Sequence, residues 1–156
     1  MDQFKSAKVY FISGHLDGLS DEIFSLHYKP SIDLGIGEEK SQFVMGDSVG
    51  ADTMAQHYLD EMAKSVPGLR DRVTVFHMFD KPRNNVGNFA THGGFKDDES
   101  RDRAMTMWST DDILWIRSAE ESKKLYGKKF RANRISGTEK NKLRREEMKK
   151  SSIIKN

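Results

Sequence analysis

The sequence predicts an α/β fold in which a central, mainly parallel sheet is covered by helices on both faces. Short apolar segments rich in β-branched and aromatic residues alternate along the chain with segments of helical periodicity. Such alternation is typical of parallel strands joined by helical crossovers. The length of 156 residues is close to the commonest size of one domain, and 36% hydrophobic residues are enough for a single core. We therefore expect one domain over residues 1–150 and a frayed tail over residues 151–156.

In the first half of the chain, the pattern predicts two strands and two helices. A buried strand covers residues 7–13 (AKVYFIS), and a helix follows that begins after a capping serine at residue 20. Residues 30–39 contain one proline and two glycines, which predicts a loop. A second strand covers residues 42–45, and apolar residues at helical spacing then predict a helix over residues 50–64.

The second half repeats the alternation with longer connections. A third strand covers residues 72–78, where β-branched and polar residues alternate. Residues 79–96 contain one proline, three asparagines and three glycines, which predicts a loop, and so long a loop in a small domain is usually functional or mobile. A helix with acidic residues in its first turn follows over residues 97–109, and a fourth strand covers residues 112–117.

A second long segment, residues 118–135, is strongly basic, and a last charged helix then runs from residue 136 to about residue 150. Nucleic-acid binding by this segment is not expected, because few aromatic residues are interleaved with its charges. A solvated surface is the favoured interpretation, and a lid that closes over an anionic ligand is an alternative. The basic residues in question are Lys123, Lys124, Lys128, Lys129, Arg131 and Arg134, with Lys140, Lys142, Arg144 and Arg145 beyond them.

Composition argues against several classes of protein. The 26 Lys and Arg residues nearly balance the 24 Asp and Glu residues, so the net charge of +2 gives no general case for binding nucleic acid or membranes. There is no cysteine, which excludes thiolate metal sites and disulfides, and no histidine pair has metal-ligand spacing. The first residues lack the apolar segment of a signal peptide. We therefore expect a cytoplasmic protein without a membrane span, a metal or a cofactor.

In parallel α/β sheets, ligands bind beside the carboxyl ends of the strands, so the strand-to-helix turns are the first place to look for function. The first such turn contains Ser13 and Gly14; a glycine lets the backbone approach a ligand, and a hydroxyl can bind a phosphate or a ribose. Used alone, this turn is more often an ordinary turn than a ligand site.

The second turn runs from Gly46 to Asp52 and carries the stronger signal. Two glycines, Gly46 and Gly50, allow a tight turn whose N–H groups and following helix face an anion, with Ser48 between them. Asp47 can accept from a ribose hydroxyl or act as a base. Asp52 is a second candidate catalytic carboxylate, although its position in the first helical turn also fits simple compensation of the helix dipole.

Two later segments complete the candidate site. Arg101 and Met105 share a face of the helix over residues 97–109, and an arginine there can clamp a phosphate. From the spacing alone, a solvated charge cluster beside a core methionine is the favoured interpretation. Ser136, Gly137 and Thr138 open the last helix and provide either a cap or an anion site. Asn141 lies one turn further along the same helix.

Taken together, these segments resemble the SLOG superfamily, the Rossmann-like group that contains the Lonely Guy phosphoribohydrolases. The resemblance extends from Ser13 to Arg145 and consists of short motifs in the expected order. It implies a Rossmann-like three-layer sandwich, and members of the superfamily often dimerise, so a homo-oligomer is expected as well. The matching motifs are the Ser13-Gly14 turn, the Gly46-to-Asp52 turn, the Arg101-to-Met105 helix segment and the Ser136-Gly137-Thr138 turn.

One position departs from that resemblance. Lonely Guy enzymes carry a catalytic glutamate three residues after the threonine of the last turn, and this chain has Asn141 there. An amide can hydrogen-bond a ribose but cannot be a carboxylate nucleophile or base. The favoured hypothesis is therefore a module that binds a phosphate-bearing nucleotide or nucleotide-sugar derivative. The alternative is an enzyme that cleaves or transfers the N-glycosidic bond of nucleoside 5′-monophosphates, with Asp47 or Asp52 as its carboxylate.

Overall fold

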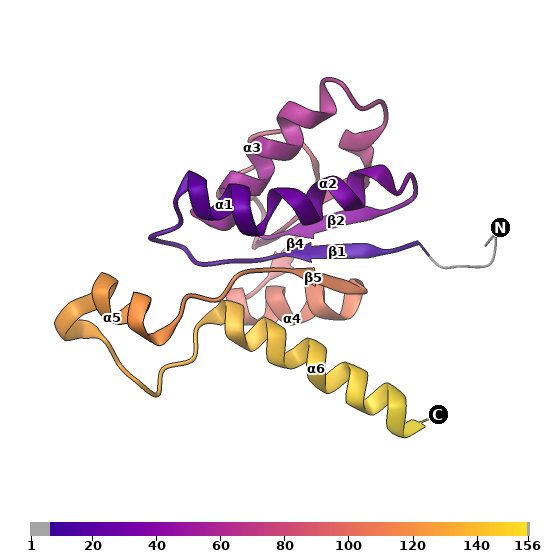
Figure 1. Cartoon of the computed structure of the whole chain (residues 1–156). Helices are drawn as coiled ribbons and strands as arrows, with labels where there is room; N and C mark the ends of the chain where they lie inside the picture. Colours follow the sequence, from indigo (N-terminus) through magenta and orange to yellow (C-terminus); the bar gives the residue numbers. More distant parts are fainter. Residues whose placement is uncertain (1–6, 156) are drawn as a thin grey trace.

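The computed structural model describes residues 7–155, with side chains up to residue 151, and contains an all-parallel sheet. Within this part of the chain the sheet has five strands in the order β4-β3-β2-β1-β5. Helices cover both faces, so the predicted α/β three-layer sandwich is confirmed (Figure 1). The strands are β1 (Val9–Ile12), β2 (Gln42–Met45), β3 (Val73–Met78), β4 (Ala90–Phe95) and β5 (Asp111–Ile113).

Strand β1 lies between β2 and β5, and its pairing with both aligns the ends of these three strands. Ile12 is paired with Met45 of β2 on one side and with Ile113 of β5 on the other. All three residues are buried and apolar, as expected for strands of a sheet that is covered on both faces. The residues that follow each strand therefore gather at one edge of the sheet.

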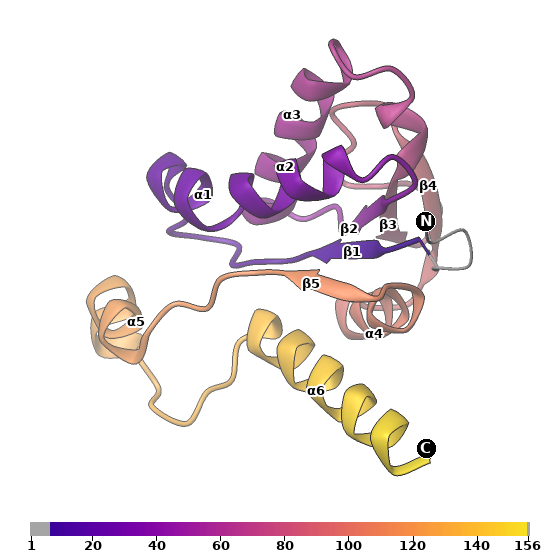
Figure 2. The same cartoon turned by 45° about the vertical axis from the view of Figure 1, so that its right-hand side comes forward.

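Two helical layers bury separate apolar clusters. One face of the sheet is covered by α1 (Asp21–His27), α2 (Lys29–Gly37) and α3 (Ala51–Ala63), and the other by α4 (Asp98–Trp108) and α6 (Gly137–Lys155), as Figures 1 and 2 show. The larger cluster includes Phe24 and Tyr28 under the first layer, and the smaller one joins Phe11, Phe76 and Met105 under α4. Helix α5 (Ala119–Tyr126) lies beyond the end of the sheet.

The predicted loop over residues 30–39 is wrong, because most of it forms helix α2. Pro30 occupies the first turn of this helix, where no N–H group needs an intrahelical acceptor. Gly35 packs against the rings of Tyr10 and Phe43, and a Cβ atom there would lie 2.9 Å from each ring. Both residues are therefore compatible with a helix that lies very close to the sheet.

The second predicted loop, residues 79–96, ends in the edge strand β4. The sequence predicts a loop at Gly93, but this glycine lies in β4: a Cβ atom there would collide with the imidazole of the buried His77, so only glycine fits this strand pairing. Conversely, the fourth predicted strand is shorter than expected, because β1 ends at Ile12 and leaves residues 114–117 without a partner for pairing.

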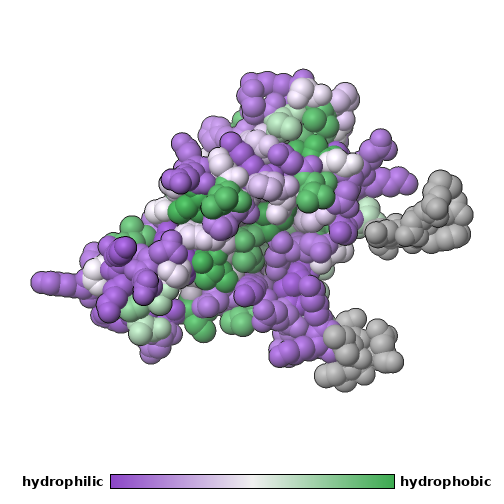
Figure 3. All heavy atoms as spheres, in the orientation of Figure 1, coloured by the Kyte–Doolittle hydropathy of each residue, from purple (hydrophilic) through white to green (hydrophobic). Residues whose placement is uncertain are grey.

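The remaining predicted boundaries agree with the structure to within a few residues. The basic segment contains α5, which begins with a capping box between Ser118 and Glu121, followed by a short 3-10 turn at Gly127–Lys129. Helix α6 continues to Lys155, past the predicted end near residue 150. No described helix is both long enough and apolar enough to cross a membrane. The segment around α5 and the exposed side of α6 are mostly hydrophilic in the view of Figure 3.

Candidate ligand-binding site

The carboxyl edge of the sheet opens onto a pocket of about 510 Å³. Its walls come from the turns after β1 and β2, from α4, from the chain after β5, and from the start of α6. Two of the predicted site residues, Asp47 and Gly50, do not line this pocket. The predicted residues that do line it are Ser13, Gly14, Gly46, Ser48, Asp52, Arg101, Ser136, Gly137, Thr138 and Asn141.

The turn after β1 is closely packed against Tyr28 and Ala51. The hydroxyl of the buried Tyr28 donates to the carbonyl oxygen of Ser13 at 2.8 Å, and a Cβ atom at Gly14 would collide with that hydroxyl and with Ala51. Ser13 is only 5% exposed, and its hydroxyl oxygen has no hydrogen-bond partner among the described residues. The turn therefore contains one buried polar group that has no partner among the described residues.

His15, which was not predicted as a site residue, also lines the pocket. Its Nε2 atom accepts from the backbone N–H of Arg117 at 2.9 Å, so the ring proton is on Nδ1. Burial, together with the nearby Arg117 charge, lowers the pKa of His15 to about 4. The imidazole is thus neutral around pH 7 and joins the turn after β1 to the chain after β5.

The two glycines of the second turn have different functions. A Cβ atom at Gly46 would lie 2.7 Å from both Arg101 Cζ and Asp52 Oδ2, so the missing side chain makes room for these two side chains. Gly50 has a φ of 80°, and a Cβ atom there would collide with the carbonyl oxygen of His15. Gly50 therefore lets the start of α3 approach the first turn and does not face the pocket.

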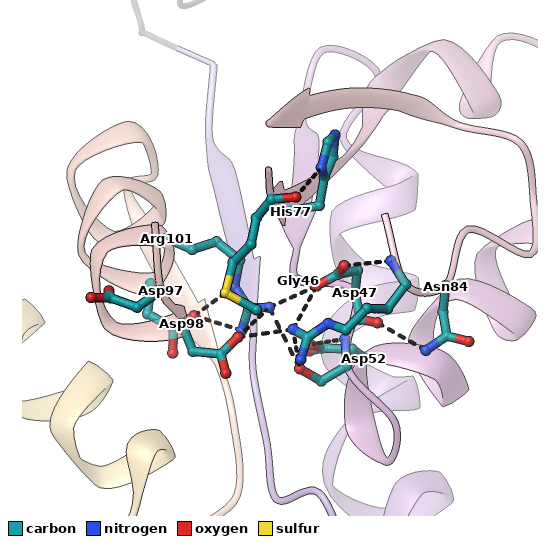
Figure 4. A network of polar contacts seen from close by, with 12 residues as sticks. Gly46, Asp47, Asp52, His77, Asn84, Asp97, Asp98 and Arg101 are labelled. Carbon is teal, nitrogen blue, oxygen red and sulfur yellow. Dashed lines mark hydrogen bonds and ion pairs between the residues drawn. The ribbon is translucent and has the colours of Figure 1, made fainter. Parts of the chain in front are cut away.

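Arg101 lies at the centre of a buried network of carboxylates (Figure 4). Its side chain reaches from α4 and donates to Asp47 Oδ1 at 2.8 Å and to Asp102 Oδ1 at 3.0 and 3.1 Å, and it lies 3.1 Å from Asp98 Oδ1. The residue is 5% exposed. Most of its donors are thus directed at carboxylates, so this arginine is arranged as their counterion and not as a free phosphate clamp.

Asp47 is held from the opposite side by the loop after β3. Arg83 donates to its carboxylate from the backbone N–H at 2.7 Å and from the guanidinium at 2.8 Å, and Asn84 donates to its carbonyl oxygen. Burial alone raises the pKa of Asp47, but the hydrogen bonds and charge of Arg83, with the charge of Arg101, outweigh it and lower this pKa. Asp47 is therefore an ionised partner of two arginines and does not face a ligand.

Asp52 is the candidate catalytic carboxylate that lines the pocket. Its Oδ2 atom accepts from the backbone N–H of Ser48 at 3.1 Å. Burial raises the pKa of Asp52 to about 7, although the charge of Arg101 acts against this rise. A carboxyl group that exchanges its proton near neutral pH can serve as an acid or a base.

The start of α6 forms the wall opposite the first two turns. Ser136 caps the helix by accepting from the N–H of Glu139 at 3.1 Å. The first N–H groups of the helix, those of Gly137 and Thr138, lack intrahelical acceptors. Asn141 is 1% exposed; its amide nitrogen donates to Asp102 Oδ2 at 3.2 Å, and its oxygen accepts from Arg144.

The basic segment comes back over the pocket as an arm, residues 118–136. The arm is attached to the rest of the domain through Asp17. The Oδ1 atom of Asp17 accepts a hydrogen bond from the hydroxyl of Tyr126 at 2.9 Å and lies 3.7 Å from Nη1 of Arg117. Gly18 is closely packed there, since a Cβ atom would lie 2.9 Å from Leu125. This attachment brings three cations to the pocket, which are Lys129, Arg131 and Arg134.

Comparison with known proteins gives no match for this chain, whether among protein-family models, curated proteins or solved structures. The fold and the pocket define the class of protein: an α/β domain with a polar pocket at the carboxyl edge of a parallel sheet. The resemblance to the SLOG superfamily stays a prediction that depends on the motifs themselves.

Proposed function

We propose that this protein binds a phosphate-bearing nucleotide or nucleotide-sugar derivative in the pocket at the carboxyl edge of the sheet, as a sensor or carrier. The main support is that one pocket collects polar groups from Ser13, from the network of Arg101 and from the start of α6. Doubly wound sheets bind ligands at this edge. A pocket of about 510 Å³ is within the usual size range for small-molecule sites.

The start of α6 and the arm provide the phosphate subsite in this proposal. The positive end of the α6 dipole and the N–H groups of Gly137 and Thr138 favour an anion there. Lys129, Arg131 and Arg134 line the same pocket from the arm, whereas Glu139 in the first turn of α6 opposes an anion. The donors of Arg101 are occupied by carboxylates, so we place the phosphate at α6 and not, as the sequence suggested, at Arg101.

Binding without turnover is favoured by Asn141. The position where the resemblance expects a catalytic glutamate holds an amide, and both ends of this amide are engaged by Asp102 and Arg144. The order of the four motifs along the chain also supports our proposal that the protein is a divergent member of the SLOG superfamily. In such a member, the pocket is kept while the catalytic group of the last turn is lost.

A second candidate function is cleavage of an N-glycosidic bond, and one observation favours it. Asp52 lines the pocket as a buried carboxyl group whose pKa is raised to about 7 by burial. A carboxylate near the anomeric carbon is what stabilisation of an oxocarbenium-like centre requires. In this alternative Asp52, and not Asp47, supplies the group.

A ligand panel separates the two functions. The purified protein is mixed with nucleosides, nucleoside monophosphates and nucleotide sugars, and each mixture is assayed by thermal shift and by chromatography for released base. At about 100 times its dissociation constant, a ligand adds roughly 2.7 kcal/mol to the free energy of unfolding, which gives a clear shift in Tm. We expect stabilisation by phosphate-bearing members without release of base. Release that is lost in Asp52→Asn establishes the glycosidase instead.

Two neighbouring lysines test where the phosphate binds. Lys129 lines the pocket, whereas Lys128 is exposed on the same turn and does not. We expect Lys129→Gln to weaken binding of a nucleoside monophosphate about tenfold, because a hydrogen bond to a charged group is lost. Lys128→Gln should change the affinity less than twofold. Equal effects of the two variants in calorimetric titrations would exclude this phosphate subsite.

A further inference from the structure

We propose that the side of strand β4 that faces away from β3, its free side, is a dimer interface. The partner is the β4 strand of a second copy of this chain, which pairs with it in the antiparallel direction. A two-fold axis perpendicular to the sheet relates the two copies, so that one sheet runs through both. This interface is separate from the pocket and does not depend on nucleotide binding.

The first argument is that β4 is uncovered. It is the outermost strand of the sheet on its side, and among the described residues it pairs only with β3 (Figure 2). Residues 90–94 are all exposed, so the described helices cover neither face of this strand. The N–H and C=O groups on its free side form a row with which another extended strand can pair.

The second argument is that β4 lacks the features that normally keep an edge strand unpaired, which are charged side chains, proline or a very short length. Residues 84–95 contain no Asp, Glu, Lys, Arg or Pro, although 32% of the residues of the chain are charged. The strand has six residues. Its pairing with β3 becomes irregular only after His92, so residues 90–92 keep a regular register.

The third argument identifies the partner as a second β4. A charged strand would lose hydration against this uncharged edge without gaining a counterion, whereas another β4 carries no charge. The outermost strand at the other side of the sheet, β5, has only three residues, and two of them are Asp111 and Asp112. Pairing of β4 with β5 of another copy would bring these carboxylates to the interface and would produce an open chain of copies. Pairing of β4 with β4 closes the assembly as a dimer.

Exposed aromatic side chains extend this surface beyond the strand. Trp108 of α4 is 52% exposed, and its ring centroid lies 5.4 Å from that of His92 on β4. Phe79 is 65% exposed, and its backbone is joined to the end of β4 by hydrogen bonds with Gly94 and Phe95. A stable interface needs about 800 Å² from each partner, and these rings add apolar area beside the paired strands. In the antiparallel pair, His92 and Trp108 of both copies lie on the same face of the sheet, where aromatic rings on adjacent strands stabilise pairing.

The test is the oligomeric state of the full chain, measured by sedimentation velocity over about a hundredfold range of protein concentration. We expect a reversible dimer. Thr91→Lys places a charge on each of the two paired strands, as natural proteins do to protect their edges. Thr91 is exposed, so the fold should be kept, and the dissociation constant of the dimer should rise about tenfold or more.

Ser25→Lys is the matched control, because it adds the same charge at an exposed position of α1. It should leave the dissociation constant within about twofold. A chain that stays monomeric over the whole range would overturn the proposal and leave the free side of β4 open to a strand of another protein. A dimer that Thr91→Lys and Ser25→Lys affect equally would show that the copies meet elsewhere.

Hydrogen–deuterium exchange of the unaltered protein gives a second test that needs no variant. We expect the amide protons of β4 to exchange more slowly as the protein concentration rises, because pairing with the second copy protects the N–H groups on the free side. The amide protons of the inner strand β2 should exchange at a rate that does not depend on concentration. If the exchange of β4 is equally independent of concentration while a dimer forms, this interface is excluded.

Discussion

Replacement of Arg101 by leucine is expected to lower the free energy of unfolding by about 3–5 kcal/mol at pH 7, the usual cost of removing one partner from a buried ion pair. The guanidinium is the shared counterion of Asp47, Asp98 and Asp102, and its residue is 5% exposed. Leucine fills much of the volume but leaves Asp102 without a cation.

Arg103→Leu provides the control for this prediction. Arg103 lies on the same helix, is exposed, and has an ion pair with Glu99 at 3.5 Å. Exposed pairs of this kind contribute well under about 1 kcal/mol. Urea denaturation of both variants and of the original protein at pH 7 is the measurement. If Arg101→Leu costs no more than Arg103→Leu, the network around Arg101 does not stabilise the fold.

The second large effect concerns Asp52 and the dependence of stability on pH. Burial raises the pKa of Asp52 from 3.8 to about 7, so the folded state favours the protonated carboxyl group. This group binds more protons in the folded state than in the unfolded state between about pH 4 and pH 7, and its contribution to stability falls as the pH rises through that range. Above pH 7 the ionised carboxylate is a destabilising group.

Asp52→Asn removes this titration while keeping an oxygen that can accept from the N–H of Ser48. We expect the variant to be more stable than the original protein by about 2–4 kcal/mol at pH 8 and nearly equal to it at pH 4. Asp80→Asn, an exposed change in the loop after β3, should leave the difference between the two pH values unchanged. Denaturation curves in which Asp52→Asn has the same pH profile as the original protein would contradict the raised pKa.

Much of the site could be predicted from sequence because parallel strands end at one edge of a sheet. Apolar segments that stop at Gly14 and Gly46 were enough to place two polar turns side by side, and the register of Ile12 with Met45 confirms that placement. Ser136 as the first cap of α6 was also visible as a local signal. Turns and helix caps depend on residues that are neighbours in the sequence, so they can be predicted from it.

What could not be predicted depends on contacts between distant segments. Arg83 has no local signature, yet it holds Asp47 across 36 positions of sequence. The sequence gives no signal that Asp102, next to Arg101, belongs to the site, because its hydrogen bond with Asn141 depends on how α4 packs against α6. The glycines at positions 35 and 93 were misread because their role is close packing in a helix and a strand, and glycine signals turns in sequence far more often.

We propose that a phosphate-bearing nucleotide binds in this pocket with its phosphate at the start of α6. The most direct measurement is a two-dimensional ¹⁵N NMR titration of the protein with the nucleoside monophosphate that gives the largest shift in Tm. We expect the amide signals of Gly137 and Thr138 to move most, together with those of Gly14 and Gly46, and those of the outward-facing Lys123 and Lys128 to stay in place. Unmoved signals at Gly137 and Thr138, with changes confined to the outer face of the arm, would contradict the claim.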